Sequence, residues 1–220
     1  MSFADELLAP VIWDESKALQ TLIDIFESDR TAVIKTYCAI DDLPIRARLE
    51  NLGFEAKREF TERGVRQQRF TCDRYDFIRA LAEAKMAEHL DMDVWQFGFD
   101  SAKRRAGLCN YTDQTITISR YLVDIHTVDE SMQVVLHEVA HAIAGKKAGH
   151  TKAWLSVAKS IGYRAEKFTG KEIAQETASW VGTCPAGHEH FRYRKPTRQL
   201  ACGLCGRGFS RRNLISWTQR

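Results

Sequence analysis

The feature that most constrains the fold is HEVAHAIAGKKAGH, residues 137–150. Three histidines and one glutamate stand here in an otherwise apolar, helix-compatible stretch. Upstream, Thr127 and Glu130 have the spacing of a capping box, in which each residue caps the other's backbone N–H. Gly145 supplies a residue suited to end a helix. The sequence therefore predicts one capped helix that carries the first part of this run.

On that helix the spacing of the polar residues suits metal chemistry. His137 and His141 are four residues apart, so both imidazoles project from one face and can share an ion. Glu138 lies beside them without being a ligand. Zinc lowers the pKa of a bound water toward about 7, and a nearby carboxylate can accept its proton. This H-E-x-x-H spacing is typical of zinc metallopeptidases.

A third protein ligand is required, because catalytic zinc usually takes three and leaves one position for water. His150 is the first candidate. It follows two glycines that allow the chain to turn back, and it opens a second predicted helix, HTKAWLSVAKSIG. Glu166 and Glu172 are the alternatives, and His150 would then be a surface or helix-capping histidine.

The composition of the 220-residue chain is that of a globular protein, with 44% hydrophobic and 28% charged residues. No apolar run approaches the roughly 18 residues that a membrane span needs. The N-terminal MSFADELLAPVIWDES is acidic and contains a proline, unlike a secretory signal. We therefore expect a cytoplasmic protein, nucleoid-associated if its source is prokaryotic, with no membrane partner. We therefore expect its six cysteines to be free thiols or metal ligands and not disulfides.

Four residues near the C-terminus have the spacing of a second metal site. Cys184 and His188 are followed, after thirteen residues, by Cys202 and Cys205, which indicates a zinc ribbon with four ligands around a structural ion. A first knuckle with a histidine departs from the commoner pair of cysteines. His190 is the alternative ligand, and a redox role for the CGLC pair is the alternative function.

The same tail is basic. From residue 184 to residue 220 it holds eight Lys and Arg residues against Glu189 alone. A basic tail of this kind suggests a polyanionic partner, above all nucleic acid, although it can also be a solvated surface. Alternating aromatic and basic side chains can stack on bases and neutralise phosphates. The residues expected to contact nucleic acid are Arg192, Tyr193, Arg194, Lys195 and Arg198.

The first 72 residues are predicted to be a mainly helical extension. Residues 15–28 have an amphipathic pattern, and residues 32–40 and 44–52 are shorter helical candidates. FEAKREF and RQQRFTC flank a turn and predict a basic hairpin. Three helices and a hairpin would suit a winged-helix DNA binder. A small packing subdomain without a nucleic-acid contact is the alternative.

The middle of the chain predicts a helix followed by a small antiparallel sheet. Residues 75–89 have helical spacing of apolar residues, and VWQFGFD alternates as a strand does. AGLCNY and TITISRYL follow with a turn between them. Cys38, Cys72 and Cys109 are expected to pack as small hydrophobic residues.

From about residue 75 to residue 209 the sequence resembles the SprT-like family, to which the Spartan DNA–protein crosslink proteases belong. AGLCNYTDQTITISRYLV, HEVAHAIAGKKAGHTKAW and the cysteine-bearing tail carry the resemblance. It implies an α+β fold, with a minimal zincin-like core at residues 73–170 and a β zinc ribbon at residues 180–212. In that core His137, His141 and His150 would hold zinc, and Glu138 would be the general acid/base. The resemblance also implies that residues 115–119 form an edge on which an extended substrate aligns. The loop at 145–149 is short for the family.

The function expected on these grounds is that of a zinc-dependent endopeptidase that acts at nucleic acid. It would hold one catalytic and one structural zinc, bind single-stranded or damaged DNA, and cleave proteins bound or crosslinked to it. Tyr163, Arg164 and Tyr193 are candidates for stabilising the transition-state oxyanion. The alternatives are a DNA-binding metalloprotein whose zinc ions are all structural, without proteolysis, and a zinc hydrolase with a non-peptide substrate.

Overall fold

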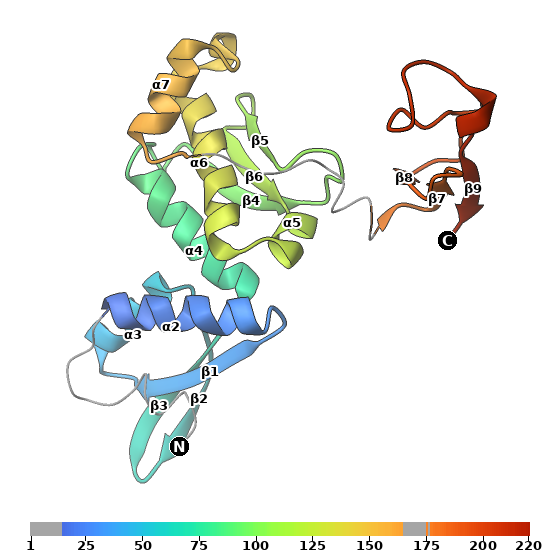
Figure 1. Ribbon diagram of the computed structural model, residues 1–220. Helices are drawn as coiled ribbons and strands as arrows, with labels where there is room; N and C mark the ends of the chain where they lie inside the picture. The colour runs from blue at the N-terminus through green and yellow to red at the C-terminus, as the bar shows by residue number, and fades with distance from the viewer. Residues whose placement is uncertain (1–14, 165–174, 176) are drawn as a thin grey trace. The chain divides into compact units, whose positions relative to one another are not determined.

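The computed structural model describes residues 15–164, residue 175 and residues 177–220. It divides into two compact units. The first comprises Met1–Asp100 and Gly107–Glu166, and the second comprises Ser101–Ala106 and Lys167–Arg220 (Figure 1). Among the described residues, no helix is long and apolar enough to cross a membrane.

The first unit begins with a three-stranded antiparallel sheet and two helices. Its strand order is β1-β3-β2. Arg63 and Gly64, both with positive φ, form the tight turn between β2 and β3, as the hairpin prediction requires. The elements are α2 (Glu15–Ser28), β1 (Val33–Ala39), α3 (Leu43–Asn51), β2 (Glu55–Glu62) and β3 (Val65–Asp73).

Two expectations for this region are wrong. Residues 32–40 are not a helix, because Val33–Ala39 forms strand β1 and pairs along its whole length with β3. The described part of the extension, residues 15–72, is therefore not mainly helical, and it does not form a winged-helix arrangement of three helices and a hairpin. The segment IKTYC alternates between buried and exposed side chains, which is the period of a strand.

One hydrophobic core joins this sheet to the helices around it. Leu22 and Phe26 of α2, Phe70 of β3 and Phe77 of the following helix are all fully buried in it. Phe26 and Phe77 pack with ring centroids 5.4 Å apart. Val128, at the start of the helix that carries HEVAH, belongs to the same core. The N-terminal sheet is thereby packed onto the half of the unit that contains this helix.

The rest of the first unit is a small sheet with helices packed on it. The elements are α4 (Arg74–Ala87), β4 (Gln96–Asp100), β5 (Gly107–Asn110), β6 (Thr115–Ser119), α5 (Arg120–Ile125), α6 (Val128–Ala144) and α7 (Lys152–Ser160). Helix α6 contacts β5, β6, α4 and α7, so it is the central element of this half (Figure 1). The predicted helices at 75–89 and 127–145 are confirmed with small shifts at their ends.

The small sheet differs from its prediction in two ways. It is mixed and not antiparallel, because β4 pairs with β6 in parallel and β5 pairs with β6 in antiparallel. The strand order is β4-β6-β5. Residues 115–119 are therefore the central strand and have no free edge for a substrate. The edge strand that contacts α6 is β5.

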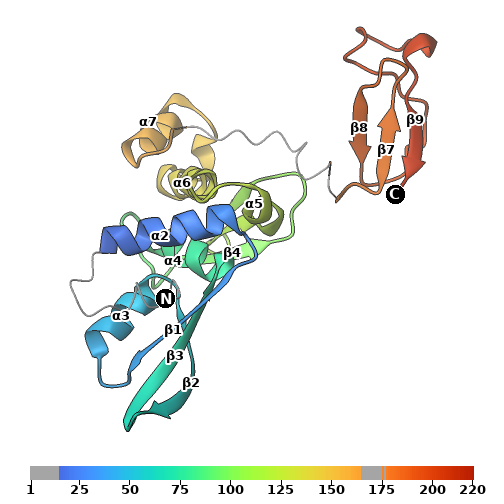
Figure 2. The same ribbon diagram turned by 60° about the horizontal axis from the view of Figure 1, so that its bottom comes forward.

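The second unit contains a three-stranded antiparallel sheet of order β8-β7-β9. Its strands are β7 (Trp180–Thr183), β8 (Glu189–Arg192) and β9 (Ser216–Gln219), shown in Figure 2. Gly182 lies beneath a tryptophan: a Cβ at this position would be 2.7 Å from the Trp217 ring. Glycine is therefore required for the close packing of β7 and β9.

A buried arginine fastens three elements of the first unit together. Arg74 is 1% exposed. Its guanidinium donates to the carbonyls of Val123 at 2.9 Å, Phe26 at 2.6 Å and His126 at 2.5 Å. Burial lowers the pKa of Arg74. The carbonyls belong to α2 and to the end of α5, so Arg74 links the N-terminal sheet region to the chain that enters α6.

We expect Arg74→Met to lower the free energy of unfolding of the first unit by about 3 kcal/mol or more. Each of the three carbonyls loses its charged donor inside the protein, and each unsatisfied group costs about 1–3 kcal/mol. Urea unfolding followed by circular dichroism measures the change. Arg120→Met, at an exposed position on α5, is the matched control and should change stability by less than about 0.5 kcal/mol.

Candidate metal centres

Helix α6 carries two of the three histidines of the first candidate site. Specific capping interactions define both ends of this helix. Thr127 accepts from the backbone N–H of Glu130 at 3.1 Å, and the Glu130 carboxylate accepts from the N–H of Thr127 at 2.9 Å. This is the predicted capping box. Gly145 ends the helix with a φ of 82°, a conformation that favours glycine. Gly149, with a φ of 50°, lets the chain return toward α6.

The structure brings the three predicted histidines together. His137 and His150 have their Nε2 atoms 3.0 Å apart, and the Nε2 of His141 lies 3.1 Å from His137 and 3.0 Å from His150. The first two sit one turn apart on α6, and the third precedes α7. Glu166 and Glu172, the alternative third ligands, lie outside the described residues.

This triangle of nitrogens has the dimensions of a zinc site. Zinc lies about 2.0–2.1 Å from each histidine nitrogen, and tetrahedral angles then separate the nitrogens by roughly 3.3 Å. A neutral imidazole nitrogen offers either a proton or a lone pair, so three of them facing one another cannot all be satisfied by mutual hydrogen bonds. A cation among them accepts all three lone pairs. The donor set therefore fits a metal ion.

An aromatic wall holds the three rings in place. Trp154 of α7 is 5% exposed, and its ring stacks on His141 with centroids 5.2 Å apart. It also contacts His137 at 4.7 Å and His150 at 4.8 Å. Tyr163 lies against His137 with centroids 5.6 Å apart. Trp154 thus contacts every ring of the cluster, and its packing fixes the direction in which the rings point.

The side chain of Glu138 points from α6 toward β5, an edge strand of the small sheet. It is 7% exposed, although it is a charged residue. A Cβ on Gly107, the first residue of β5, would lie 2.7 Å from both the Cγ and the Oε1 of Glu138. The absence of a side chain at Gly107 is therefore what makes room for the carboxylate. Glu138 is consequently placed next to β5, the edge strand beside α6.

The surroundings of Glu138 are shielded from water. Burial, together with the charge of Glu138, raises the pKa of the Cys109 thiol to about 12. Burial also raises the pKa of Tyr111 to about 12, and its hydroxyl donates to the His141 carbonyl at 2.8 Å. Cys109 is a buried neutral thiol, as predicted, and Tyr111 ties β5 and its turn to the last turn of α6.

Gly107→Ala should displace the Glu138 carboxylate. With Glu138 as the general base of a peptidase, the role proposed below, a displacement of about 1 Å should lower the rate constant of cleavage by about 100-fold. Zinc content should be unchanged, since the three atoms nearest to the new methyl group belong to Glu138 and Val134. Gly98→Ala in β4 is the matched control. Its Cβ would meet one atom, Thr117 Cγ2, at 3.7 Å, an ordinary contact distance. Equal activity of the two variants would contradict the assignment of Gly107.

The second candidate site lies in the second unit. His188 Nδ1 is 3.5 Å from the Sγ of Cys184, 3.3 Å from that of Cys205 and 3.6 Å from that of Cys202. The Cys184 and Cys205 sulfurs are 3.7 Å apart. Tetrahedral zinc with sulfur ligands at about 2.3 Å separates them by roughly 3.8 Å, so this donor set also fits. His188 and not His190 joins the cluster.

The backbone of the first knuckle stabilises a thiolate. Burial acts to raise the pKa of Cys184, but hydrogen bonds from the backbone of His188 and Ala186 oppose it and lower the pKa to about 6. Gly187, with a φ of 81°, allows this tight turn. Thiolate is the form of cysteine that ligates metal, so the knuckle is arranged for a cation.

The residues predicted to contact nucleic acid are spread over the second unit. Arg192 ends β8 with its Cζ 5.9 Å from the Trp217 ring centroid, and Lys195 lies 5.6 Å from that of Trp180. Tyr193 is half-buried, and its hydroxyl donates to the carbonyl of Lys103 at 3.1 Å. The exposed members of the predicted set are Arg192, Arg194, Lys195 and Arg198.

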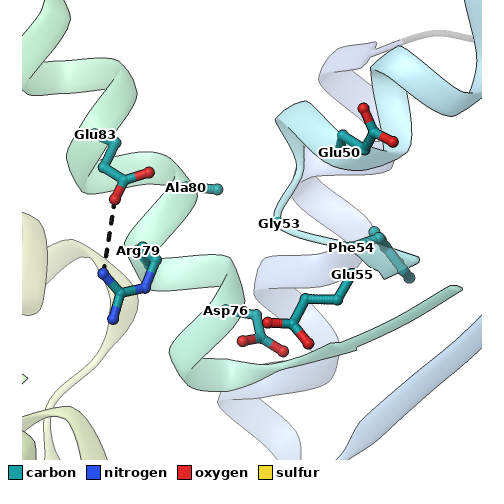
Figure 3. Close-up of a pocket in the computed structure, with 8 residues that line it drawn as sticks. All are labelled: Glu50, Gly53, Phe54, Glu55, Asp76, Arg79, Ala80 and Glu83. Carbon is teal, nitrogen blue, oxygen red and sulfur yellow. Dashed lines mark ion pairs between the residues drawn. The ribbon is translucent and has the colours of Figure 1, made fainter. Parts of the chain in front are cut away.

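A pocket of about 190 Å³ lies away from both clusters, where α3, β2 and α4 meet (Figure 3). It is acidic: Glu50, Glu55, Asp76 and Glu83 line it with a single arginine, Arg79. Arg79 pairs with Glu83 at 3.7 Å. Burial raises the pKa of Asp76. None of the predicted site residues lines this pocket.

Residues 78–176 match the model of the SprT-like family. The match contains the three histidines and Glu138, and it supports membership in that family, which is of the metalloprotease type. The clusters described above are candidate metal sites consistent with zinc. No curated protein and no solved structure gives a significant match.

Proposed function

We propose that the chain is a zinc-dependent endopeptidase that acts at nucleic acid on proteins bound or crosslinked to DNA. The observation that carries the proposal is the triangle of Nε2 atoms from His137, His141 and His150, with sides of 3.0–3.1 Å, beside a buried glutamate. Residues that hold zinc only structurally need no carboxylate next to them. Glu138 therefore favours catalysis over a structural role.

Each residue of the site has a proposed task. The three histidines would hold the ion, which when bound would supply Lewis acidity and an acidified water. Glu138 would accept the proton of the attacking water and pass it to the departing amine. Its burial beside β5 keeps the carboxylate out of bulk water, which strengthens its interactions with charged groups.

Strand β5 is the proposed alignment edge for an extended substrate. It is paired with β6 on one side, so the N–H and C=O groups of its other side are the ones that a peptide can bond by β-augmentation. Leu108 is 39% exposed on this strand, and the adjacent Gly107 borders Glu138. A peptide paired with β5 would thus pass the general base.

Tyr163 is the proposed partner for the oxyanion. Its ring lies against that of His137, with ring centroids 5.6 Å apart. Arg164 instead forms a two-pronged ion pair with Asp129 at 2.5 and 2.6 Å, near the start of α6. Tyr193 belongs to the second unit and bonds there to Lys103.

Digestion of an unstructured protein tests the peptidase assignment. The zinc-loaded chain should generate new amino termini, detectable by mass spectrometry, and a chelator should stop their formation. The alternative of a nucleic-acid-binding protein with purely structural zinc requires that no protein, including the chain itself, is cleaved under any of these conditions.

A further inference from the structure

The N-terminal sheet has one covered face and one open face. Cys38, Phe70 and Cys72 point into the core under the helices. Helices α2 and α3 lie on this side of the sheet in both views (Figures 1 and 2). Side chains that alternate with them make up the opposite face, and none of these is buried. This outer face consists of Val33, Lys35 and Tyr37 of β1, Val65, Gln67, Arg69 and Thr71 of β3, and Glu55, Phe60 and Glu62 of β2.

Aromatic and cationic side chains meet at the centre of the outer face. Tyr37 is 39% exposed and packs edge-on against Phe60 with ring centroids 5.5 Å apart. The Arg69 Cζ lies 5.3 Å from the Phe60 ring centroid. Strand register brings them together, because Tyr37 is paired with Arg69 across β1 and β3. The Tyr37 ring and the Arg69 guanidinium are both planar groups on which another planar group can stack.

Among the described residues, cations outnumber unpaired acidic residues on this face, because Lys35, Arg58 and Arg69 stand against Glu62 alone. Lys35 is exposed next to Tyr37 on the same strand, and Arg58 is exposed at the irregularity of β2 opposite Arg69. Neither forms an ion pair with any residue that the structure describes. Glu55, at the start of β2, is neutralised by Lys57 at 2.5 Å. Glu55 also lines the acidic pocket, which lies at the junction with α3 and α4 (Figure 3).

We propose that the outer face of the N-terminal sheet binds single-stranded nucleic acid. Unpaired bases would stack on Tyr37 and on the guanidinium of Arg69, and phosphates would lie along Lys35 and Arg58. Aromatic platforms bordered by cations bind single strands in this way, whereas a duplex keeps the faces of its bases stacked inside. This inference depends on the proposed function in one respect, namely that nucleic acid is taken as the partner. It places a second contact surface outside the basic tail.

The test is binding of a fluorescein-labelled oligothymidine of about 20 nucleotides, longer than the site of one binding fold. The full chain carrying Glu138→Gln is used, so that proteolysis cannot alter the signal. We expect Tyr37→Ala to weaken binding by about 5- to 100-fold and Tyr37→Phe to leave it unchanged. Lys35→Gln should reduce the slope of log affinity against log salt by about 0.7. A hairpin duplex should bind more weakly than the single strand.

Two control variants and a crosslink locate the site. Leu43→Ala removes an apolar side chain that is 65% exposed outside this face, and Lys159→Gln removes an exposed lysine of α7. Both should bind as the parent does. On irradiation, an oligonucleotide that contains 5-iodouracil should crosslink to peptides from residues 33–73. Crosslinks confined to residues 177–220, with unchanged affinity of Tyr37→Ala, would overturn the proposal.

The outcome is separable from the fate of the proposed function. Cleavage of a free unstructured protein by an otherwise wild-type Tyr37→Ala chain should equal that of the parent chain, because the outer face holds no residue of the histidine cluster. A chain that cleaves protein but binds no oligothymidine would refute the nucleic-acid surface and leave the peptidase assignment standing. A DNA oligothymidine and an RNA oligouridine, compared directly, distinguish the two sources of single strands.

Discussion

Glu138→Gln is expected to retain zinc at the histidine cluster and to lose proteolysis. Glutamine has nearly the shape of glutamate, so it fits the space that Gly107 leaves beside β5. It cannot accept a proton from water. General-base catalysis contributes about 10²–10⁴-fold, so the rate constant for peptide cleavage should fall by about that factor. Zinc per chain by atomic emission, and turnover of a fluorogenic peptide, measure the two quantities.

His141→Ala is the companion variant that separates the base from the ligands. It should lose both the ion and the activity, whereas Glu138→Gln should lose the activity alone. Glu130→Gln, in the cap of the same helix, is the matched control and should retain both. A Glu138→Gln chain with wild-type turnover would show that Glu138 is not the base.

Cys202→Ser is expected to remove one zinc per chain and to unfold the second unit. Cys202 is fully buried, and its Sγ lies 3.6 Å from His188 Nδ1 within the four-ligand cluster. The sheet of this unit has three strands of four residues each, which bury little apolar surface. Structural zinc supplies the folding free energy of such small domains, and they unfold without it.

Hydrogen exchange measures this loss directly. Amides of residues 180–219 should become unprotected in Cys202→Ser, while amides of α6 keep their protection because the first unit has its own core. Cys38→Ser makes the same substitution at a buried thiol outside both clusters. It should keep both zinc ions and the protection of the second unit. Full protection of Cys202→Ser without zinc would contradict a structural role for the metal.

Local signals explain what could be predicted of the site. The capping box at Thr127, the spacing of His137 and His141, and the glycines before His150 all act within one or two helical turns. Their structural consequences can therefore be derived from short stretches of sequence. The cysteine knuckles are local in the same sense. Each of the two knuckles is a turn of a few residues, and the spacing of the two ligands within a knuckle determines the shape of that turn.

Long-range pairing explains most of what could not be predicted. Strand β1 pairs with residues of β3 that lie 28 to 40 positions further along the chain, and this pairing makes a strand of a segment that also suits a helix. The parallel pairing of β4 with β6 likewise depends on where the β5–β6 hairpin docks. Gly107 was missed for the same reason. A glycine at the start of a strand signals a close approach, but the partner, Glu138, is set by the fold.

One digestion tests directly whether this chain cuts proteins at DNA. A protein crosslinked to single-stranded DNA is incubated with the zinc-loaded chain and analysed by gel electrophoresis, beside the same protein without DNA. We expect fragments from the crosslinked protein, fewer from the free protein, and none with a chelator or with Glu138→Gln. An intact substrate, with two zinc ions bound per chain and DNA binding demonstrated, would contradict the account.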